Sequence, residues 1–339
     1  MPKKYENMND GAEMREEEAK KRSTRRFTLN PFENVFRRDG KGVDKEELKV
    51  LDKPGIVNYF KLMVRRFNHI FSVNLLTVFG NFPVFFILIA LAYTTKEAIG
   101  PDSQLYAALQ GSAYFDHSPL ITALMGVFGR QDSVSVMTGA TYVFLGLSLL
   151  IFVTFGPVNT GVAYVLRNII RGEGVFVWSN FWYAIKKNLR QAIIFGIIDL
   201  LMIAMLVFDV LSYRVNAGLS SINMALYVIS YGMSILYFFI RMYPYLMIVT
   251  FDMGIFKIIK NSVFFSILGI KRNICALIVT VVLVVLDVML INVFMPLGLL
   301  LPFIILFGIG QYTSVYCAFP KIKQIMIDPY YKEVRKTEE

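Results

Sequence analysis

The sequence predicts an all-α fold: a polytopic membrane helix bundle with six transmembrane helices and cytoplasmic N and C termini. Its mean hydropathy of +0.53 and its 55% hydrophobic residues are too apolar for a soluble chain of 339 residues. A transmembrane helix needs about 20 mostly apolar residues to cross a hydrocarbon core of about 30 Å. Charge-poor stretches of this kind run over residues 70–92, 134–155, 192–212, 222–243, 274–294 and 297–319.

The distribution of lysine and arginine predicts the orientation of these spans. Of the 35 basic residues, 32 lie on alternate segments that begin with the N-terminal region and end with the tail, and 3 lie on the segments between them. Basic residues are retained on the cytoplasmic side during insertion, so both termini are expected there. The net charge of +10 is explained by attraction to anionic lipids of the inner leaflet, and no nucleic-acid partner is expected.

Two cytoplasmic segments are expected before the first span. Residues 1–26 are dominated by charge and bury too little apolar surface to offset the entropy of ordering, so we expect a disordered charged tail. Residues 27–68 are more apolar and predict an amphipathic juxtamembrane segment. From Pro54 onward, apolar residues recur at helical spacing with basic residues opposite them, which indicates a helix on the inner leaflet.

The six-span membrane domain is expected to cover residues 69–320, followed by a cytoplasmic tail over residues 321–339. Residues 93–133 form the one long segment predicted to lie outside the cytoplasm. A loop of this length without secondary structure is unusual, and its apolar residues are interrupted by glycine and proline. We therefore expect one or two short helices on the outer membrane surface.

A weak internal repeat connects two halves of the membrane domain. Pro157 and Pro244 each follow a span, and an amphipathic stretch after each proline leads to a basic pair closed by asparagine. These triplets are Lys186-Lys187-Asn188 and Lys271-Arg272-Asn273. Because proline disfavours the continuation of a helix, each proline is expected to end its span.

Ionisable side chains inside spans are the default candidates for function, because a charge in hydrocarbon is costly. Asp199, Asp287 and Arg241 meet this condition. One interpretation is a proton- or cation-coupled carrier that uses the two aspartates. The other interpretation, which we favour, is structural: each carboxyl group is protonated or hydrogen-bonded to an asparagine or a tyrosine hydroxyl, and Arg241 is an anchor at the membrane interface.

No motif for catalysis, phosphate binding or ATP hydrolysis is found, so the chain is expected to be neither an enzyme nor an ATPase. His69 and His117 are too few and too scattered for a metal cluster, and no metal or other cofactor is expected. Cys275 and Cys317 fall inside predicted spans, where cysteine most often serves as a small apolar residue.

Four short motifs follow one another: Asn74-Leu75-Leu76 with Pro83, a Gly-Pro pair, an Arg-Gly-Glu turn and an aromatic–lysine–asparagine helix. The last three are formed by Gly156, Pro157, Arg171, Gly172, Glu173, Phe181, Lys186, Lys187 and Asn188. In this order they resemble the YesL-type family, small integral membrane proteins of Gram-positive bacteria that are classed as a domain of unknown function. The resemblance covers roughly residues 55–215.

The resemblance implies a bacterial plasma membrane protein with a role near carbohydrate uptake, because genes of this family tend to lie beside carbohydrate ABC importers and their sensor kinases. It implies no catalytic residue. We therefore expect an accessory or scaffold subunit of such an importer; the alternatives are a stand-alone secondary transporter and a membrane partner of a sensor kinase. Residues 172–187 are basic and aromatic and lack the Glu-Ala-Ala-type coupling loop of an ABC permease, which argues against a pore subunit.

Two segments depart from the family pattern, the N-terminal extension and the insertion over residues 93–133. Both carry aromatic and apolar side chains, which commonly mark contacts with protein or lipid when they gather on a surface. We expect importer subunits to bind there. The partner-binding candidates are Phe27, Phe32, Phe36, Tyr106, Tyr114, Phe115 and Phe128.

The charge distribution makes the topology testable by cysteine labelling in intact cells. A cysteine placed at Ser103 is expected to react with an impermeant thiol reagent, because residue 103 lies in the segment predicted outside. Cysteines at Ser179 and Thr337 are expected to react only after lysis. Labelling at Ser179 in unbroken cells would contradict the six-span arrangement.

Overall fold

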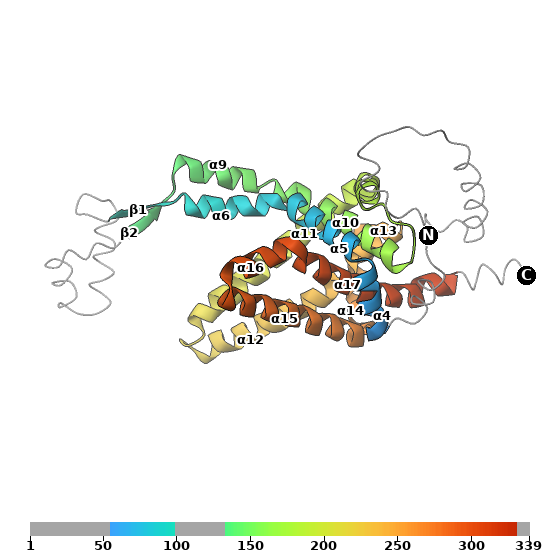
Figure 1. Cartoon of the computed structure of the whole chain (residues 1–339). Coiled ribbons are helices and arrows are strands. Elements are labelled where there is room, and N and C mark those ends of the chain that lie inside the picture. The colour runs from blue at the N-terminus through green and yellow to red at the C-terminus, as the bar shows by residue number, and fades with distance from the viewer. Residues whose placement is uncertain (1–54, 99–132, 331–339) are drawn as a thin grey trace, which may run out of the picture. The chain divides into compact units, whose positions relative to one another are not determined.

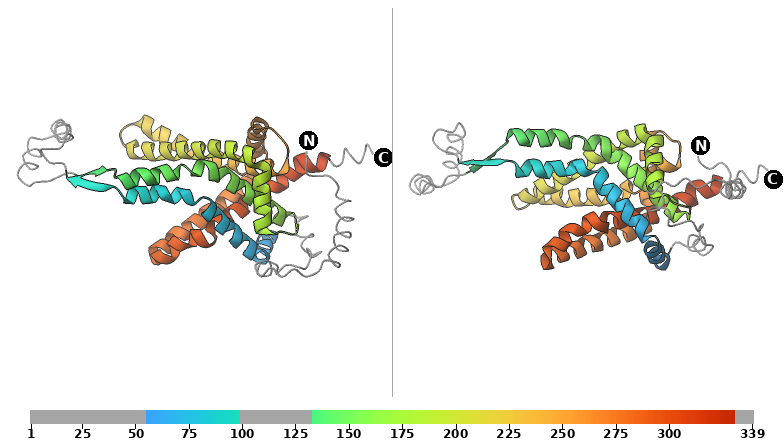
Figure 2. Two further views of the ribbon diagram at one scale, coloured as in Figure 1. Left: turned by 90° about the horizontal axis from the view of Figure 1, so that it is seen from above. Right: turned by 45° about the horizontal axis from the view of Figure 1, so that its top comes forward.

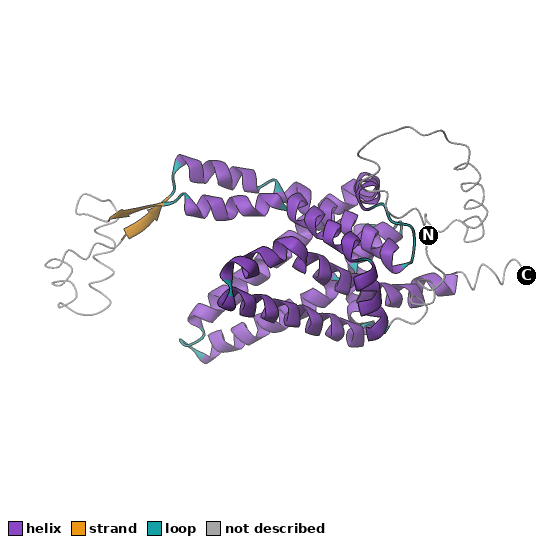
Figure 3. Ribbon diagram, viewed as in Figure 1, coloured by secondary structure: helices purple, strands orange, loops and turns teal. Residues whose placement is uncertain are grey.

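The computed structural model describes residues 55–98 and 133–330, which form helices joined by turns and loops and one short antiparallel ladder (Figure 1, Figure 3). They belong to two compact units. The smaller unit covers Phe82–Ile151, and the larger one holds the remaining described residues, 55–81 and 152–330. The buried apolar core lies in the larger unit.

The larger unit is built from helices joined by short turns, with α11 beside α12 and α15 beside α17 (Figure 2). Its described elements are α4 (Ile56–Arg65), α5 (Phe67–Gly80), α10 (Ile151–Ile170), α11 (Val177–Asn216), α12 (Ser221–Arg241), α13 (Pro244–Thr250), α14 (Ile255–Leu268), α15 (Ile270–Val293), α16 (Met295–Leu301), η2 (Pro302–Leu306), α17 (Phe307–Ile322) and η3 (Lys323–Ile327). Both η2 and η3 are π-helical turns inside a longer helical stretch.

Helix lengths and composition confirm the predicted all-α membrane fold. Among the described residues, five helical stretches are long and apolar enough to cross a membrane, and Phe67–Gly80 with Phe82–Ala92 makes a sixth if the pair forms one span. The five are Gly139–Ile170, Val177–Asn216, Ser221–Thr250, Ile270–Val293 and Met295–Tyr330. They follow the order of the predicted spans, and their orientation in the membrane stays a prediction.

The smaller unit contains a short strand ladder. The surface helices expected within residues 93–133 stay a prediction, because residues 99–132 lie outside the described residues. Its elements are η1 (Phe82–Val84), α6 (Phe85–Ala92), β1 (Thr95–Ala98), β2 (Ser133–Val136) and α9 (Gly139–Ser148). The two strands pair antiparallel, with Thr95 opposite Val136 and Ala98 opposite Ser133. The alternating Ser-Val-Ser-Val of β2 is a strand pattern of period two, and this strand takes up the first residues of the stretch 134–155 that was predicted as a span.

Pro157 does not end a helix, which corrects one expectation from the repeat. It lies inside α10, which continues to Ile170. The helix continues because it packs closely on α11: a Cβ on Gly156 would overlap the carbonyl oxygen of Ala192, and one on Gly196 would overlap the backbone of Gly156. Small residues let two helices approach in this way, and that packing outweighs the backbone hydrogen bond that proline removes. Pro244 behaves as expected and begins α13 after a break.

The two basic triplets of the repeat mark two corresponding bends. Asn188 has non-helical backbone angles (φ −118°, ψ 17°), so α11 is kinked between its amphipathic first part and its apolar second part. In the second half, α14 ends at Gly269, and α15 begins with the residues of the other triplet. Both halves therefore turn from an amphipathic helix into a span at the basic triplet.

The amphipathic helix predicted before the first span is α4, and it docks on α17. The buried Tyr59 hydroxyl lies 2.7 Å from Oγ1 of Thr313, and the Tyr312 hydroxyl donates to the Tyr59 carbonyl oxygen at 3.0 Å. Burial raises the pKa of Tyr59 above its ordinary value, so this phenol stays neutral. The opposite side of α4 carries exposed apolar side chains such as Ile56 and Val64.

Asn74, a fully buried residue of α5, closes a break in the backbone ladder between α16 and α17. Its amide nitrogen donates to the carbonyl oxygens of Pro302 (3.2 Å) and Phe303 (2.6 Å). Its Oδ1 accepts the backbone N–H of Gly308 at 2.7 Å. A Cβ on Gly308 would lie 2.8 Å from the carbonyl oxygen of Ile70, so glycine permits this close approach. One side chain therefore satisfies the groups that the π-helical turn η2 leaves open.

Replacing Asn74 by alanine is expected to lower the free energy of unfolding by about 2–3 kcal/mol, because the backbone groups of Pro302, Phe303 and Gly308 lose the hydrogen bonds that this side chain makes. Thermal or denaturant unfolding in detergent measures this change. Asn292→Ala is the matched control, since the exposed Asn292 amide bonds only to the Val288 carbonyl oxygen of its own helix. An equal loss in both variants would contradict the assigned role of Asn74.

Candidate functional site

Asp199 is the centre of a buried polar network in the larger unit. Its side chain is fully buried on α11. The Tyr237 hydroxyl donates to Oδ1 at 2.7 Å, and the Tyr245 hydroxyl donates to Oδ2 at 2.5 Å. Nε of Arg241 lies 2.9 Å from Oδ1 and 3.0 Å from Oδ2. Both carboxylate oxygens are thus held by donors from two further helices.

The positions of these partners follow from local helix geometry. Tyr237 and Arg241 are four residues apart on α12, so they lie on one face of that helix. Tyr245 comes just after the break before α13, where Pro244 occupies the first turn. The break redirects the chain, and Tyr245 reaches the carboxylate from a second side.

Arg241 pairs with Asp199, a contact that its interpretation as an anchor at the membrane interface did not include. Its side chain is 34% exposed, whereas that of Asp199 is 0% exposed. The guanidinium also lies 5.6 Å from the ring centroid of Phe155 and 6.0 Å from that of Tyr245. A carboxylate buried in this way needs a counter-ion and hydrogen bonds, and the network supplies both.

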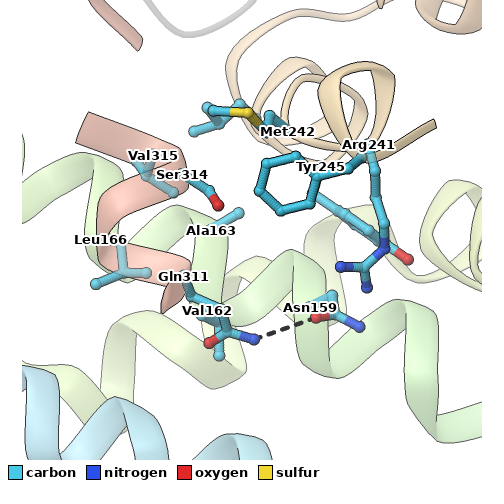
Figure 4. A pocket seen from close by; sticks show the side chains of 12 residues that line it. Asn159, Val162, Ala163, Leu166, Arg241, Met242, Tyr245, Gln311, Ser314 and Val315 are labelled. Atoms are coloured by element: carbon cyan, nitrogen blue, oxygen red, sulfur yellow. Dashed lines mark hydrogen bonds between the residues drawn. The ribbon is translucent and has the colours of Figure 1, made fainter. Parts of the chain in front are cut away.

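A small cavity lies beside the network, between α10, α12, α13 and α17 (Figure 4). Its volume is about 70 Å³. Five side chains with polar groups line it, those of Asn159, Arg241, Tyr245, Gln311 and Ser314, and its other walls are apolar. Nε2 of Gln311 donates to Oδ1 of Asn159 at 3.4 Å, and Oε1 of Gln311 accepts from Thr77 at 2.9 Å.

Asp287, the other intramembrane carboxylate, takes no part in this network. It lies on α15, and its buried Oδ1 has no hydrogen-bond partner among the described residues. No hydrogen bond joins it to Asp199, whose two oxygens are occupied by Arg241 and the tyrosines. The two aspartates of the carrier interpretation therefore have different surroundings.

The Arg-Gly-Glu motif forms the turn that ends α10. Gly172 has a positive φ of 67°, which favours glycine. Its N–H donates to the Ile169 carbonyl oxygen at 3.1 Å, and the N–H of Glu173 donates to the Asn168 carbonyl oxygen at 3.0 Å. These bonds define a Schellman motif. The side chains of Arg171 and Glu173 form an ion pair at 3.0 Å across the glycine.

The other motif residues mainly serve packing and bending. A Cβ on Gly161 would overlap the ring of Phe181, so the buried Phe181 fixes how the first part of α11 lies on α10. Lys186 and Lys187 are exposed, and Nζ of Lys187 donates to the Tyr183 hydroxyl at 3.0 Å. The amide of Asn188 donates to the Ala184 carbonyl oxygen at 2.9 Å beside the kink.

Sequence reasoning missed a buried arginine, Arg167 of α10, whose exposed fraction is 3%. Its Nη1 donates to the Val249 carbonyl oxygen at 2.7 Å, and its Nη2 donates to Oδ1 of Asn168 at 3.0 Å. The guanidinium also lies 4.7 Å from the ring centroid of Tyr164. This arginine links α10 to α13.

The sequence held one indication of the Asp199 network. Tyr237 and Arg241 are four residues apart, a spacing that puts both side chains on one face of a helix.

The partner-binding candidates lie outside the described residues. This applies to Phe27, Phe32, Phe36, Tyr106, Tyr114, Phe115 and Phe128.

Comparison with known proteins finds one match. Residues 136–210 match a family model described as "Protein of unknown function, DUF624". The matched part includes α10 with its motifs, the kink at Asn188 and Asp199, and it excludes Tyr237, Arg241 and Tyr245. No curated protein and no solved structure matches the chain. The family resemblance therefore stands as similarity of this part to an uncharacterised family.

The same substitution at the two aspartates separates their roles. Asp199→Asn is expected to lower the free energy of unfolding by about 1–3 kcal/mol, because Arg241 loses its counter-ion. A fully buried pair would lose more, but Arg241 is 34% exposed and solvent screening reduces the effect. Asp287→Asn is expected to be neutral or stabilising, because it removes a carboxylate whose Oδ1 has no described partner.

Equilibrium unfolding in mixed detergent micelles measures both variants against the unmodified protein. A loss at Asp287→Asn as large as that at Asp199→Asn would contradict the assignment of Asp199 as the structural centre.

Proposed function

We propose that this chain is a non-enzymatic protein of the bacterial plasma membrane that acts as an accessory or scaffold subunit of a carbohydrate ABC importer. The observation that carries the proposal is the closed state of its intramembrane centre. The Asp199 carboxylate accepts four hydrogen bonds and is fully buried, as expected of a group that holds helices together. A carrier needs a carboxylate that can exchange its partners with substrate or protons.

The size of the cavity supports the same reading. Its volume of about 70 Å³ is well below the range of about 300–1,000 Å³ typical of sites for small-molecule ligands. A sugar does not fit in such a space. The bundle serves better as a rigid frame that positions binding segments, and the resemblance to the YesL-type family suggests importer subunits as the partners.

A second candidate function, a stand-alone secondary transporter, is favoured by one observation. Oδ1 of Asp287 is buried and has no hydrogen-bond partner in the part of the chain that the structure describes. An intramembrane carboxylate in this condition is a candidate for proton or cation coupling. The two functions differ in whether the purified protein moves solute alone.

The scaffold proposal is tested by purification from native membranes in mild detergent, followed by mass spectrometry. Importer subunits are expected to co-purify in fixed ratios. Replacing residues 100–130 by a Gly-Ser chain of equal length is expected to leave an inserted protein but release these subunits, because the spans are defined independently of that segment. Asp287→Asn in the full-length chain is the control and is expected to retain them. Retention of the same partners by the replacement variant would contradict binding through this segment.

Proteoliposomes containing only the purified protein separate the two functions. No sugar uptake is expected from the isolated protein. Robust proton-dependent flux that is lost in Asp287→Asn would overturn the accessory role in favour of the carrier.

A further inference from the structure

Arg241 uses only part of its guanidinium to hold Asp199. Both hydrogen bonds to the carboxylate leave from Nε, at 2.9 and 3.0 Å. Nη1 and Nη2 make no hydrogen bond to any described residue, yet the side chain lines the cavity and is 34% exposed. Four N–H donors are therefore held beside the cavity on a side chain whose orientation is already fixed.

The remaining polar groups of the cavity offer more donors. Asn159 and Gln311 point toward the space in front of Arg241 (Figure 4). Each amide oxygen already accepts one hydrogen bond, Oδ1 of Asn159 from Gln311 and Oε1 of Gln311 from Thr77. Each amide nitrogen makes one hydrogen bond and keeps a second N–H, with Asn159 donating to the Phe155 carbonyl oxygen.

We propose that this cavity binds a singly charged oxyanion of phosphate type on Nη1 and Nη2 of Arg241. The planar guanidinium fork matches the oxygens of a phosphate group and binds them through two parallel hydrogen bonds. Since Asp199 already offsets the charge of Arg241, the site supplies oriented donors rather than net positive charge. It therefore suits a phosphodiester or a dihydrogen phosphate, each with one negative charge, better than a multiply charged ion.

Size and surroundings agree with this ligand. The volume of about 70 Å³ exceeds the 10–15 Å³ or so that one water molecule needs, and it accommodates a small oxygen-bearing group. Mostly apolar side chains, among them Val162 and Leu166, line the rest of the cavity beside these donors. The phosphate can come from a lipid headgroup or from free inorganic phosphate, and the chemistry at Arg241 is the same. The site does not depend on the scaffold role.

Two variants test the site without removing the charge that Asp199 requires. Arg241→Lys keeps a cation for Asp199 but removes the guanidinium fork. Ser314→Leu fills the cavity from α17 and leaves Arg241 unchanged, because the Ser314 hydroxyl bonds only to the Gly310 carbonyl oxygen of its own helix. Arg214→Lys, at an exposed position near the end of α11, is the matched control.

Delipidated protein in detergent is titrated with inorganic phosphate, with a phosphatidylglycerol, and with diacylglycerol of the same chains as the phosphate-free control. Thermal unfolding gives the apparent affinity, and native mass spectrometry counts bound lipid. Saturable stabilisation by phosphate, by phosphatidylglycerol or by both is expected, and none by diacylglycerol. Both cavity variants are expected to weaken the apparent affinity by about tenfold or more, whereas Arg214→Lys leaves it unchanged.

Phosphate alone as the active probe identifies a free oxyanion, and phosphatidylglycerol alone identifies a lipid headgroup. The proposal is overturned if neither probe stabilises the unmodified protein in a saturable way. It is also overturned if Arg241→Lys and Ser314→Leu, both folded, bind the active probe as the unmodified protein does.

Discussion

Inside a hydrocarbon layer each polar group must find its partner within the protein, because no water is present to take that role. Regular helices meet this constraint for the backbone, and at two interruptions here a side chain completes it. Asn74 does so at the π-helical turn η2. At the corner between α14 and α15, the Tyr243 hydroxyl donates to Oδ1 of Asn273 at 2.7 Å, and the Asn273 amide donates to the Ser266 carbonyl oxygen at 2.9 Å.

The charged Asp199 carboxylate is subject to the same constraint, because it too needs partners within the protein. Desolvation of a carboxylate and a guanidinium costs much of what their attraction returns, so a buried ion pair contributes less to stability than to the choice of one arrangement. Here the geometry specifies which faces of α11, α12 and α13 meet, because only one rotation of α12 brings both Tyr237 and Arg241 to Asp199. Arg241 binds the Asp199 carboxylate through Nε, and its Nη1 and Nη2 atoms still face the cavity.

The spans could be predicted from sequence because hydropathy is a local property of about 20 consecutive residues. What depends on contact between distant segments could not. Pro157 was expected to end a helix, but α10 continues through it. The close packing of Gly196 against Gly156 that favours this continuation joins two separate spans, so the local sequence does not reveal it. The partners of Asp199 lie 38 to 46 residues away in the chain, and residue type alone did not single out two tyrosines from 18. The family model also ends before these partners begin.

The two aspartates differ because the helices that follow them differ. Asp199 lies 11 residues after Asn188, whereas Asp287 lies 14 residues after Asn273, which is about 4.5 Å further along its helix at 1.5 Å per residue. The chain after α11 returns through α12, which carries Tyr237 and Arg241 near its end. After α15 the chain has no lysine or arginine before Lys321, so the returning helix brings no basic counter-ion at the depth of Asp287. In the first half of the repeat the carboxylate is therefore surrounded by donors, whereas in the second half one carboxylate oxygen has no described partner.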